Sequence, residues 1–241
     1  DVLVFAENDG EYDASEATAA ADEDFADSFQ NFEIIKFSYL YGDTVDMAYL
    51  QDIQHVALGD NVYSSTLLGL SDGATLEFQK DNGSYDVTVE LTETAGDESF
   101  NVSLDSDGYG DDFGEMTLAG VETLNLSTDV KCKDYDMWDG DLEDGIDPSL
   151  VGLTFDLDVD ALETLNITGL TGLDLSGIAL TTVETVDATG LAGDFSLDLT
   201  GNANDVTVDA GDGDNMIIGG DGADTITVGD GDNYIEGGAD D

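Results

Sequence analysis

The sequence predicts an all-β protein, a parallel β-solenoid or β-roll with short helices near its N-terminal part. The first observation is that short segments of alternating apolar and polar residues recur about every ten residues. The second is a spacing of 21 residues, from Phe32 to Ile53 and again from Leu162 to Val183, between phrases of one pattern. The third is a glycine- and aspartate-rich repeat of nine residues that begins at Gly201. Because one coil cannot bury its own apolar face, stability has to come from stacking.

The first third of the chain is its least regular part. Residues 1–31 are expected to form a strand around Leu3 and then an Ala-rich helix, which starts with a capping box at Asp13. A second short helix is predicted over residues 43–51. Three alternating segments within residues 75–104 predict hairpin-like strands.

The remaining chain is expected to be one continuous stack. Residues 32–200 form an irregular parallel β-solenoid, in which the acidic, loop-rich stretch 105–147 is a decoration, and residues 201–241 form a nonapeptide β-roll. Residues 1–31 then supply a strand that completes a neighbouring repeat and a connecting helix. The later short strands are expected near Leu165, Leu173, Val186, Leu197 and Val206.

The charge is extreme, with 57 Asp and Glu residues against 4 Lys and no Arg, and a net charge of -53. Self-repulsion of this size opposes compaction and implies a counter-cation. An acidic field repels phosphate backbones, and no apolar run is long enough to span a bilayer, so neither nucleic acid binding nor membrane insertion is expected. Adaptation to high salt is the alternative explanation of the acidity, although it predicts no particular spacing of glycine and aspartate.

Catalysis is not expected. His55 is the only histidine and lies in a strand-like phrase, and the HExxH motif, the P-loop and the dinucleotide fingerprint are all absent. Cys132 is the only cysteine, which excludes an internal disulfide framework and a thiolate metal cluster. It is interpreted as an incidental thiol, with a link between copies as the alternative.

The nonapeptides have a spacing that chemistry explains. Glycines at the first, second and fourth positions permit a tight turn, the sixth residue presents a carboxylate, and the eighth enters the core. Calcium fits such turns, because it accepts six to eight oxygen ligands from carbonyls and carboxylates in a loose geometry. The four complete units, in order from Gly201, are GNANDVTVD, AGDGDNMII, GGDGADTIT and VGDGDNYIE.

These units resemble the nonapeptide repeats of the repeats-in-toxin (RTX) family, with the pattern GGxGxDxUx, and the unit that starts at Gly219 matches every defined position. The resemblance implies turns that alternate between the two sides of a roll and bind Ca²⁺. Val206 at the sixth position, with Asn202 and Asn204 in the place of glycines, makes the first unit a structural rung. The resemblance implies side-chain ligation by Asp224 and, more weakly, by Asn215 and Asn233, and turn carbonyls around Gly211, Gly213, Gly220, Gly222, Gly229 and Gly231.

The two ends of the sequence fit together. Gly237 opens a fifth unit, GGADD, which the first residues complete, with Asp1 at the metal-binding sixth position and Leu3 at the apolar eighth. The chain is therefore expected to be one period of something longer. The period is either a tandem repeat in a giant polypeptide or a separate subunit that contacts copies of itself head to tail.

Phrases such as VETLNLS, followed by nonapeptides, also resemble bacterial surface-layer proteins and large type I secreted adhesins. This resemblance implies an extracellular structural protein that forms a surface layer, filament or adhesin stalk, reaches the cell surface by type I secretion, and has cell-surface polysaccharide as a further partner. The alternative is a calcium-dependent secretion or folding module of a larger secreted enzyme or toxin.

A third hypothesis is a carbohydrate-binding module that uses Tyr135 and Trp138, although a buried Trp138 that anchors its loop is the preferred interpretation. Two acidic clusters, one from Asp105 and one from Asp139, are weaker candidates for cation sites. The first lacks the complete spacing of an EF-hand loop, because Met116 holds its twelfth position.

Overall fold

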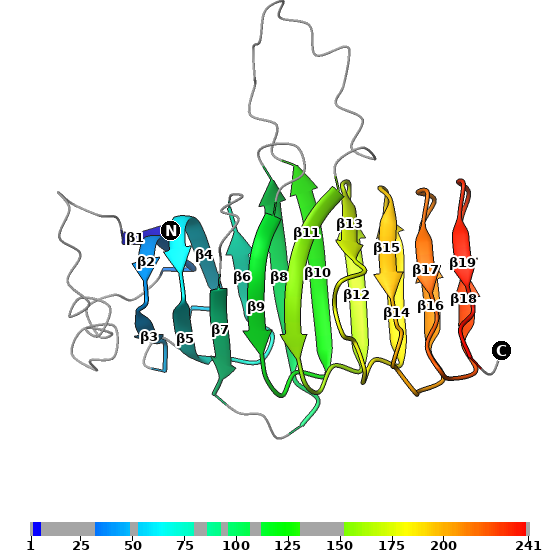
Figure 1. Ribbon diagram of the computed structural model, residues 1–241. Helices are drawn as coiled ribbons and strands as arrows, with labels where there is room; N and C mark the ends of the chain where they lie inside the picture. Colours follow the sequence, from blue (N-terminus) through cyan, green and yellow to red (C-terminus); the bar gives the residue numbers. More distant parts are fainter. Residues whose placement is uncertain are drawn as a thin grey trace, which may run out of the picture.

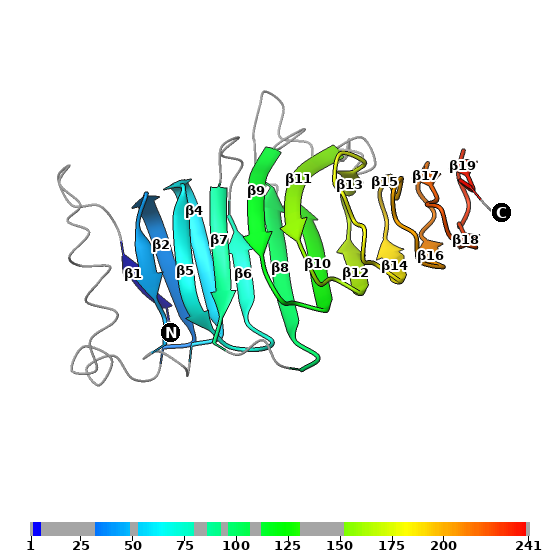
Figure 2. The same cartoon turned by 60° about the horizontal axis from the view of Figure 1, so that its bottom comes forward.

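A computed structural model describes residues 2–5, 32–48, 53–79, 86–92, 96–106, 112–130 and 152–239. These residues form two parallel β-sheets that face each other, and the chain passes from one sheet to the other along a single axis (Figure 1). Figure 2 shows the same two layers after a rotation of 60°. The predicted all-β parallel solenoid is confirmed.

The ten-stranded sheet, sheet A, has its strands in the order β1-β2-β4-β6-β8-β10-β12-β14-β16-β18. Its strands are β1 (Val2–Phe5), β2 (Ile34–Tyr41), β4 (His55–Tyr63), β6 (Thr75–Phe78), β8 (Ser99–Ser106), β10 (Thr123–Val130), β12 (Thr164–Gly169), β14 (Thr185–Leu191), β16 (Thr207–Ala210) and β18 (Thr225–Thr227). The nine-stranded sheet, sheet B, contains β3 (Thr44–Asp46), β5 (Ser65–Leu70), β7 (Asp86–Leu91), β9 (Asp112–Leu118), β11 (Gly152–Val159), β13 (Gly172–Leu175), β15 (Phe195–Asp198), β17 (Met216–Ile218) and β19 (Tyr234–Glu236).

The register shows that the VETLNLS-type phrases and the nonapeptides are the same structural unit. From β8 onward, each coil places a hydroxyl residue opposite the hydroxyl residue of the next coil, in a column on sheet A. The column crosses residue 201 without a break, so the irregular coils and the nonapeptide coils share one pair of sheets. Its members are Ser99, Thr123, Thr164, Thr185, Thr207 and Thr225.

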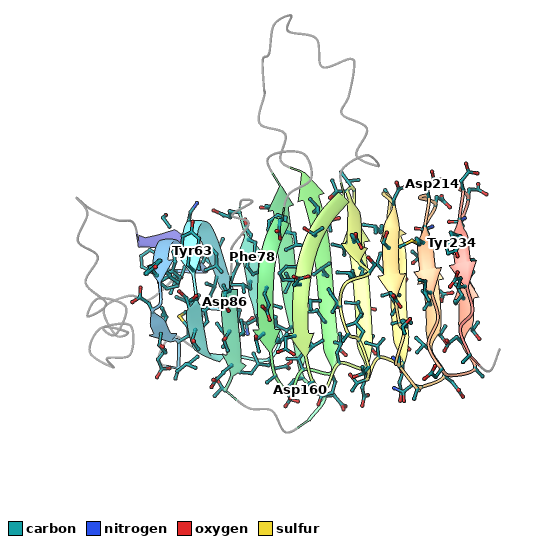
Figure 3. All side chains as sticks on the ribbon, viewed as in Figure 1. Tyr63, Phe78, Asp86, Asp160, Asp214 and Tyr234 are labelled. Carbon is teal, nitrogen blue, oxygen red and sulfur yellow. The ribbon has the colours of Figure 1, made fainter. Side chains whose placement is uncertain are left out.

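The core lies between the two sheets and consists of the inward half of each alternating strand. Phe78 contacts Phe113 and Phe155 in T-shaped geometry, with ring centroids 6.3 and 5.4 Å apart. All three rings are buried, and Figure 3 labels Phe78 within the stack. Aromatic layers of this kind fill the wide middle of the solenoid, whereas the nonapeptide coils use smaller side chains such as Val208 and Ile217.

The outward face of sheet A carries an amide ladder beside the hydroxyl column. Asn166 Nδ2 donates to Asn125 Oδ1 at 2.8 Å, and Asn125 Nδ2 donates to Asn101 Oδ1 at 2.9 Å. Side-chain amides in register form hydrogen bonds with one another along the axis, and these bonds favour stacking of consecutive coils. The next member of this column is Asp187, and hydrogen bonds from the Thr189 hydroxyl and N–H lower its pKa.

Two of the predictions for the first third of the chain are wrong. Instead of a helix over 43–51, Thr44–Asp46 form strand β3, because Val45 packs into the core and the strand pairs with β5. Instead of hairpins, β6 and β8 pair in parallel in sheet A, and β7 lies in sheet B. Burial between stacked coils decides both outcomes. The helix expected from Asp13 lies outside the described residues.

None of the described residues forms a helix with the length and apolar character needed to cross a membrane.

Candidate metal centre

The nonapeptide turns lie at the two edges where the chain changes sheet. The A-to-B turns, residues 211–215 and 228–233, connect β16 to β17 and β18 to β19. The B-to-A turns, residues 199–206 and 219–224, connect β15 to β16 and β17 to β18, and Gly237 begins another turn at this edge. The predicted alternation of turns is therefore confirmed. Figure 3 shows Asp214 at one edge of the stack and Asp160 at the other.

Close stacking of the turns requires glycine at particular positions. A Cβ on Gly222 would lie 1.9 Å from the carbonyl oxygen of Asn204, and one on Gly220 would lie 2.3 Å from the carbonyl oxygen of Asn202. At the other edge, a Cβ on Gly213 would lie 2.4 Å from Gly193 O. These separations are far below van der Waals contact, so the glycines permit neighbouring turns to bring their carbonyl groups together.

Asp224 joins two successive B-to-A turns. Its Oδ1 accepts a hydrogen bond from the N–H of Val206 in the preceding turn at 2.9 Å, and its Oδ2 accepts one from Gly220 N–H in its own turn at 2.8 Å. A carboxylate in this position places negative charge between stacked turns, close to their carbonyl groups. Val206 itself is buried, as expected for a structural rung.

The sixth positions of the A-to-B turns hold amides. Asn215 Nδ2 donates to Gly213 O at 2.7 Å, to Gly211 O at 3.1 Å and to Asn233 Oδ1 at 2.9 Å. Asn233 Nδ2 lies 3.3 Å from Gly229 O and 3.2 Å from Gly231 O. The Oδ1 atom of Asn215 is buried and has no hydrogen-bond partner among the described residues.

A ladder of aspartates runs along the A-to-B edge. Asp214 Oδ1 accepts a hydrogen bond from Asp232 N–H at 2.7 Å, and Asp194 Oδ1 accepts one from Asp214 N–H at 2.8 Å. Adjacent coils are about 4.8 Å apart in such a sheet, so these carboxylates repel one another along the axis. Asp212 Oδ1 likewise accepts a hydrogen bond from Asp230 N–H, at 3.1 Å.

The donor set fits calcium better than a softer or smaller ion. Within the described ranges, no group of three or more His, Cys, Asp or Glu side chains is placed to hold a metal ion. A cation in these turns would therefore be held mainly by backbone carbonyls, with single carboxylates such as Asp224 at the sixth position. Calcium accepts carbonyl oxygens at irregular geometry, whereas Mg²⁺ demands a nearly ideal octahedron and keeps its waters. When bound, calcium supplies positive charge that neutralises the aspartates.

Several candidate residues from the sequence lie outside the described residues: Asp1, Cys132, Tyr135, Trp138 and the cluster from Asp139. Asp105 is buried at the end of β8, and residues 107–111 of its cluster also lie outside the described residues. The structure brings together Asp224 and Gly220 at one edge and Asn215 and Asn233 at the other.

The sequence marked Asn202 as part of a structural rung but did not predict the contacts of its amide. Asn202 is completely buried, and its Nδ2 donates to Leu180 O at 2.9 Å and to Val183 O at 2.8 Å in the preceding B-to-A turn. Asn204 Nδ2 reaches Thr182 O in the same turn at 3.0 Å. The signal was present in the sequence as asparagine in the place of glycine at the second and fourth positions of the unit GNANDVTVD.

Residues 198–226 and 209–241 match the family model of the RTX calcium-binding nonapeptide repeat. No curated protein and no solved structure matches the chain. The match covers the turns described above, so the C-terminal coils carry calcium-binding repeats of the RTX type, and the cofactor that they imply is Ca²⁺.

Replacing Asp224 by Ala is expected to weaken calcium binding at the nonapeptide end. Asp209→Ala is the matched control, because Asp209 lies in strand β16 at an outward position, where it pairs with Asp187 and Thr227. We expect a reduction in calcium affinity of tenfold or more for the first variant and little change for the second, in calcium titrations followed by calorimetry. Equal affinities for the two variants would contradict the assigned register.

Proposed function

We propose that this chain is an extracellular calcium-binding structural protein, exported by type I secretion, whose units continue head to tail along the solenoid axis as a surface layer, filament or adhesin stalk. One observation carries the proposal: the described residues form a single stack in which the terminal strands of sheet A, β1 and β18, lie at opposite ends. The RTX repeats support the calcium-binding and secreted parts of this role. No catalytic role is included, and His55, the only histidine, has its Nε2 atom 2.7 Å from Glu77 Oε2.

The order of the sheets supports axial continuation. Strand β19 lies in sheet B, and the alternation of the sheets would place a strand that follows the turn from Gly237 in sheet A, beside β18. Strand β1 is the terminal strand of sheet A at the opposite end. A β1 strand from a following unit could therefore pair with β18, with the same parallel direction as every other strand.

The register agrees with the order of the sheets. Val208 of β16 pairs with Ile226 of β18, and the same step of 18 residues from Ile226 leads, across the junction, to Leu3 of a following unit. Leu3 already pairs with the buried Ile35 on its other side. An apolar column can thus pass from one unit to the next without a shift.

The C-terminal end of the stack exposes apolar side chains that are buried in earlier coils. Ile235 is 44% exposed, whereas its partner Ile217 in the preceding coil is completely buried. Ile226 is only partly buried, whereas Val208 is completely buried. Two different ends that fit each other make a heterologous contact, which propagates into a fibre instead of closing into a dimer.

Substituting Ile235 by Asp is expected to abolish axial assembly, because it places a charge in the interface that a following coil would cover. Thr185→Asp is the matched control, since Thr185 is exposed on strand β14, away from both ends of the stack. In calcium, light scattering and negative-stain microscopy should show extended particles for the wild type and the control, and single units for Ile235→Asp. Leu3→Asp tests the opposite end in the same way. Normal fibres from both variants would reject the head-to-tail contact.

The denatured mass of the native polypeptide distinguishes the two forms of this proposal. A mass near 25.3 kDa indicates separate subunits, and a large multiple indicates tandem repeats within one chain. The sequence on either side of this unit distinguishes the proposed function from the alternative. Further copies of this unit would favour a structural protein, whereas a catalytic domain would favour a secretion or folding module of an enzyme or toxin.

A further inference from the structure

The two edges of the nonapeptide roll differ in the chemistry of their sixth residue. Asp224, at the B-to-A edge, has only acceptor oxygens, and both accept hydrogen bonds from backbone N–H groups. Asn215 and Asn233, at the A-to-B edge, have an NH₂ group as well, and it points to the carbonyl groups of the turn. The sixth residue therefore binds backbone N–H groups at the B-to-A edge, whereas at the A-to-B edge its amide group also binds turn carbonyls.

The amide nitrogen of Asn215 lies where three oxygens converge. Gly213 O, Gly211 O and Asn233 Oδ1 all lie within 3.1 Å of this one atom. This convergence determines the orientation of the amide, because a flip would place Asn215 Oδ1 against three oxygens. This orientation leaves Oδ1 buried without a partner among the described residues, which is unfavourable. The three contacts of Nδ2 with oxygen atoms offset that loss.

The arrangement recurs in two other turns. Asn233 Nδ2 reaches the carbonyls of Gly229 and Gly231, which correspond to Gly211 and Gly213 one coil earlier. In the first nonapeptide unit, at the B-to-A edge, Asn202 Nδ2 bridges two carbonyls of the preceding turn, those of Leu180 and Val183. That unit has Val206 at its sixth position, so the chain also uses an amide to bridge turn carbonyls where the sixth position offers no carboxylate.

We propose that the amides of Asn215 and Asn233 take the place of a cation, so that the A-to-B turns close without calcium and the B-to-A edge alone depends on it. The inference rests on the proposed calcium-binding function. A neutral NH₂ group donates two hydrogen bonds to the carbonyl oxygens and brings no net charge. It fills the position that an ion would need, and an amide oxygen attracts a cation less than a carboxylate does. Calcium then lies on one edge of the roll.

The test converts the amides into carboxylates. In the double variant Asn215→Asp, Asn233→Asp, the added carboxylates face the turn carbonyls without a donor, which is unfavourable unless a cation lies between them. We expect the variant to melt below the wild type in chelator, to recover in calcium, and to bind more calcium per chain than the wild type in equilibrium dialysis. Asn233→Asp alone, in the more exposed turn, should show the same direction of change if the double variant does not fold.

The control removes the amides without adding charge. Asn215→Ala, Asn233→Ala should lower the melting temperature equally in calcium and in chelator and leave the calcium count at the wild-type value. A loss of bound calcium in this variant, or an unchanged count in the aspartate variants, would overturn the inference. If the wild type itself binds no calcium, and Asp224→Ala changes nothing, the proposed function fails instead. The aspartate variants still report separately on whether the A-to-B turns accept a cation once the amides are gone.

Discussion

Chelation of calcium at low salt is expected to eliminate the β-sheet circular dichroism of the C-terminal coils. With a net charge of -53, the chain has almost no internal cation to balance its acids, and the stacked B-to-A turns bring the carboxylates of Asp205 and Asp224 against the neighbouring turn. Binding energy for a metal that only the folded state can hold becomes folding energy, so removing the ion removes that stabilisation.

The measurement is a far-UV spectrum in stringently chelated buffer, followed by titration with calcium and, separately, with NaCl. Recovery should require calcium at concentrations far below those at which monovalent salt acts by screening. Full retention of the spectrum without calcium would contradict the prediction. Recovery by NaCl alone would assign the acidity to salt adaptation instead.

Truncation of Phe78 to Ala is expected to destabilise the solenoid by about 3–5 kcal/mol, because it opens a cavity where three aromatic rings meet. Phe78 is completely buried and contacts Phe113 and Phe155, so neither neighbour can fill the space without leaving its own coil. The effect should spread along the axis, since each coil is stabilised mainly by the coils that it contacts.

Urea unfolding in saturating calcium provides the measurement, and Leu170→Ala is the matched control. Leu170 is also a large apolar residue but is 57% exposed, so its loss should change the midpoint little. A midpoint for Phe78→Ala equal to that of the control would show that the aromatic layer does not stabilise the stack. Phe78→Leu, which removes less volume, should lie between the two.

The period of the coils and the chemistry of the turns were predictable from local patterns. The 21-residue spacing reappears as the pairing of Thr164 with Thr185, and the eighth position of the nonapeptides as the buried Val208 and Ile217. These features can be predicted from the sequence because every coil of a solenoid makes the same contacts with the next coil. Each residue meets its own equivalent one coil away, so periodicity along the chain is periodicity in space.

The secondary structure of the irregular coils could not be predicted from local patterns in this way. The segment around Val45 was predicted to be a helix, yet it forms strand β3, because it pairs in parallel with β5 and buries Val45 in the core. Similarly, the short connections between β6, β7 and β8 are compatible with hairpins. In the structure these strands instead alternate between the two sheets and pair in parallel with the strands of the neighbouring coils.

Local patterns in the sequence were enough to predict the all-β solenoid, the RTX-type turns, the alternation of those turns between two edges, and calcium as the fitting ion. Which groups contact one another across the coils depended on the tertiary structure. Asn202, Asn215 and Asn233 could have been ligands, linkers or surface residues in any local reading of the chain. Their amides became bridges between carbonyl groups because glycines let neighbouring turns approach closely, and that approach is a property of two stacked turns rather than of either one.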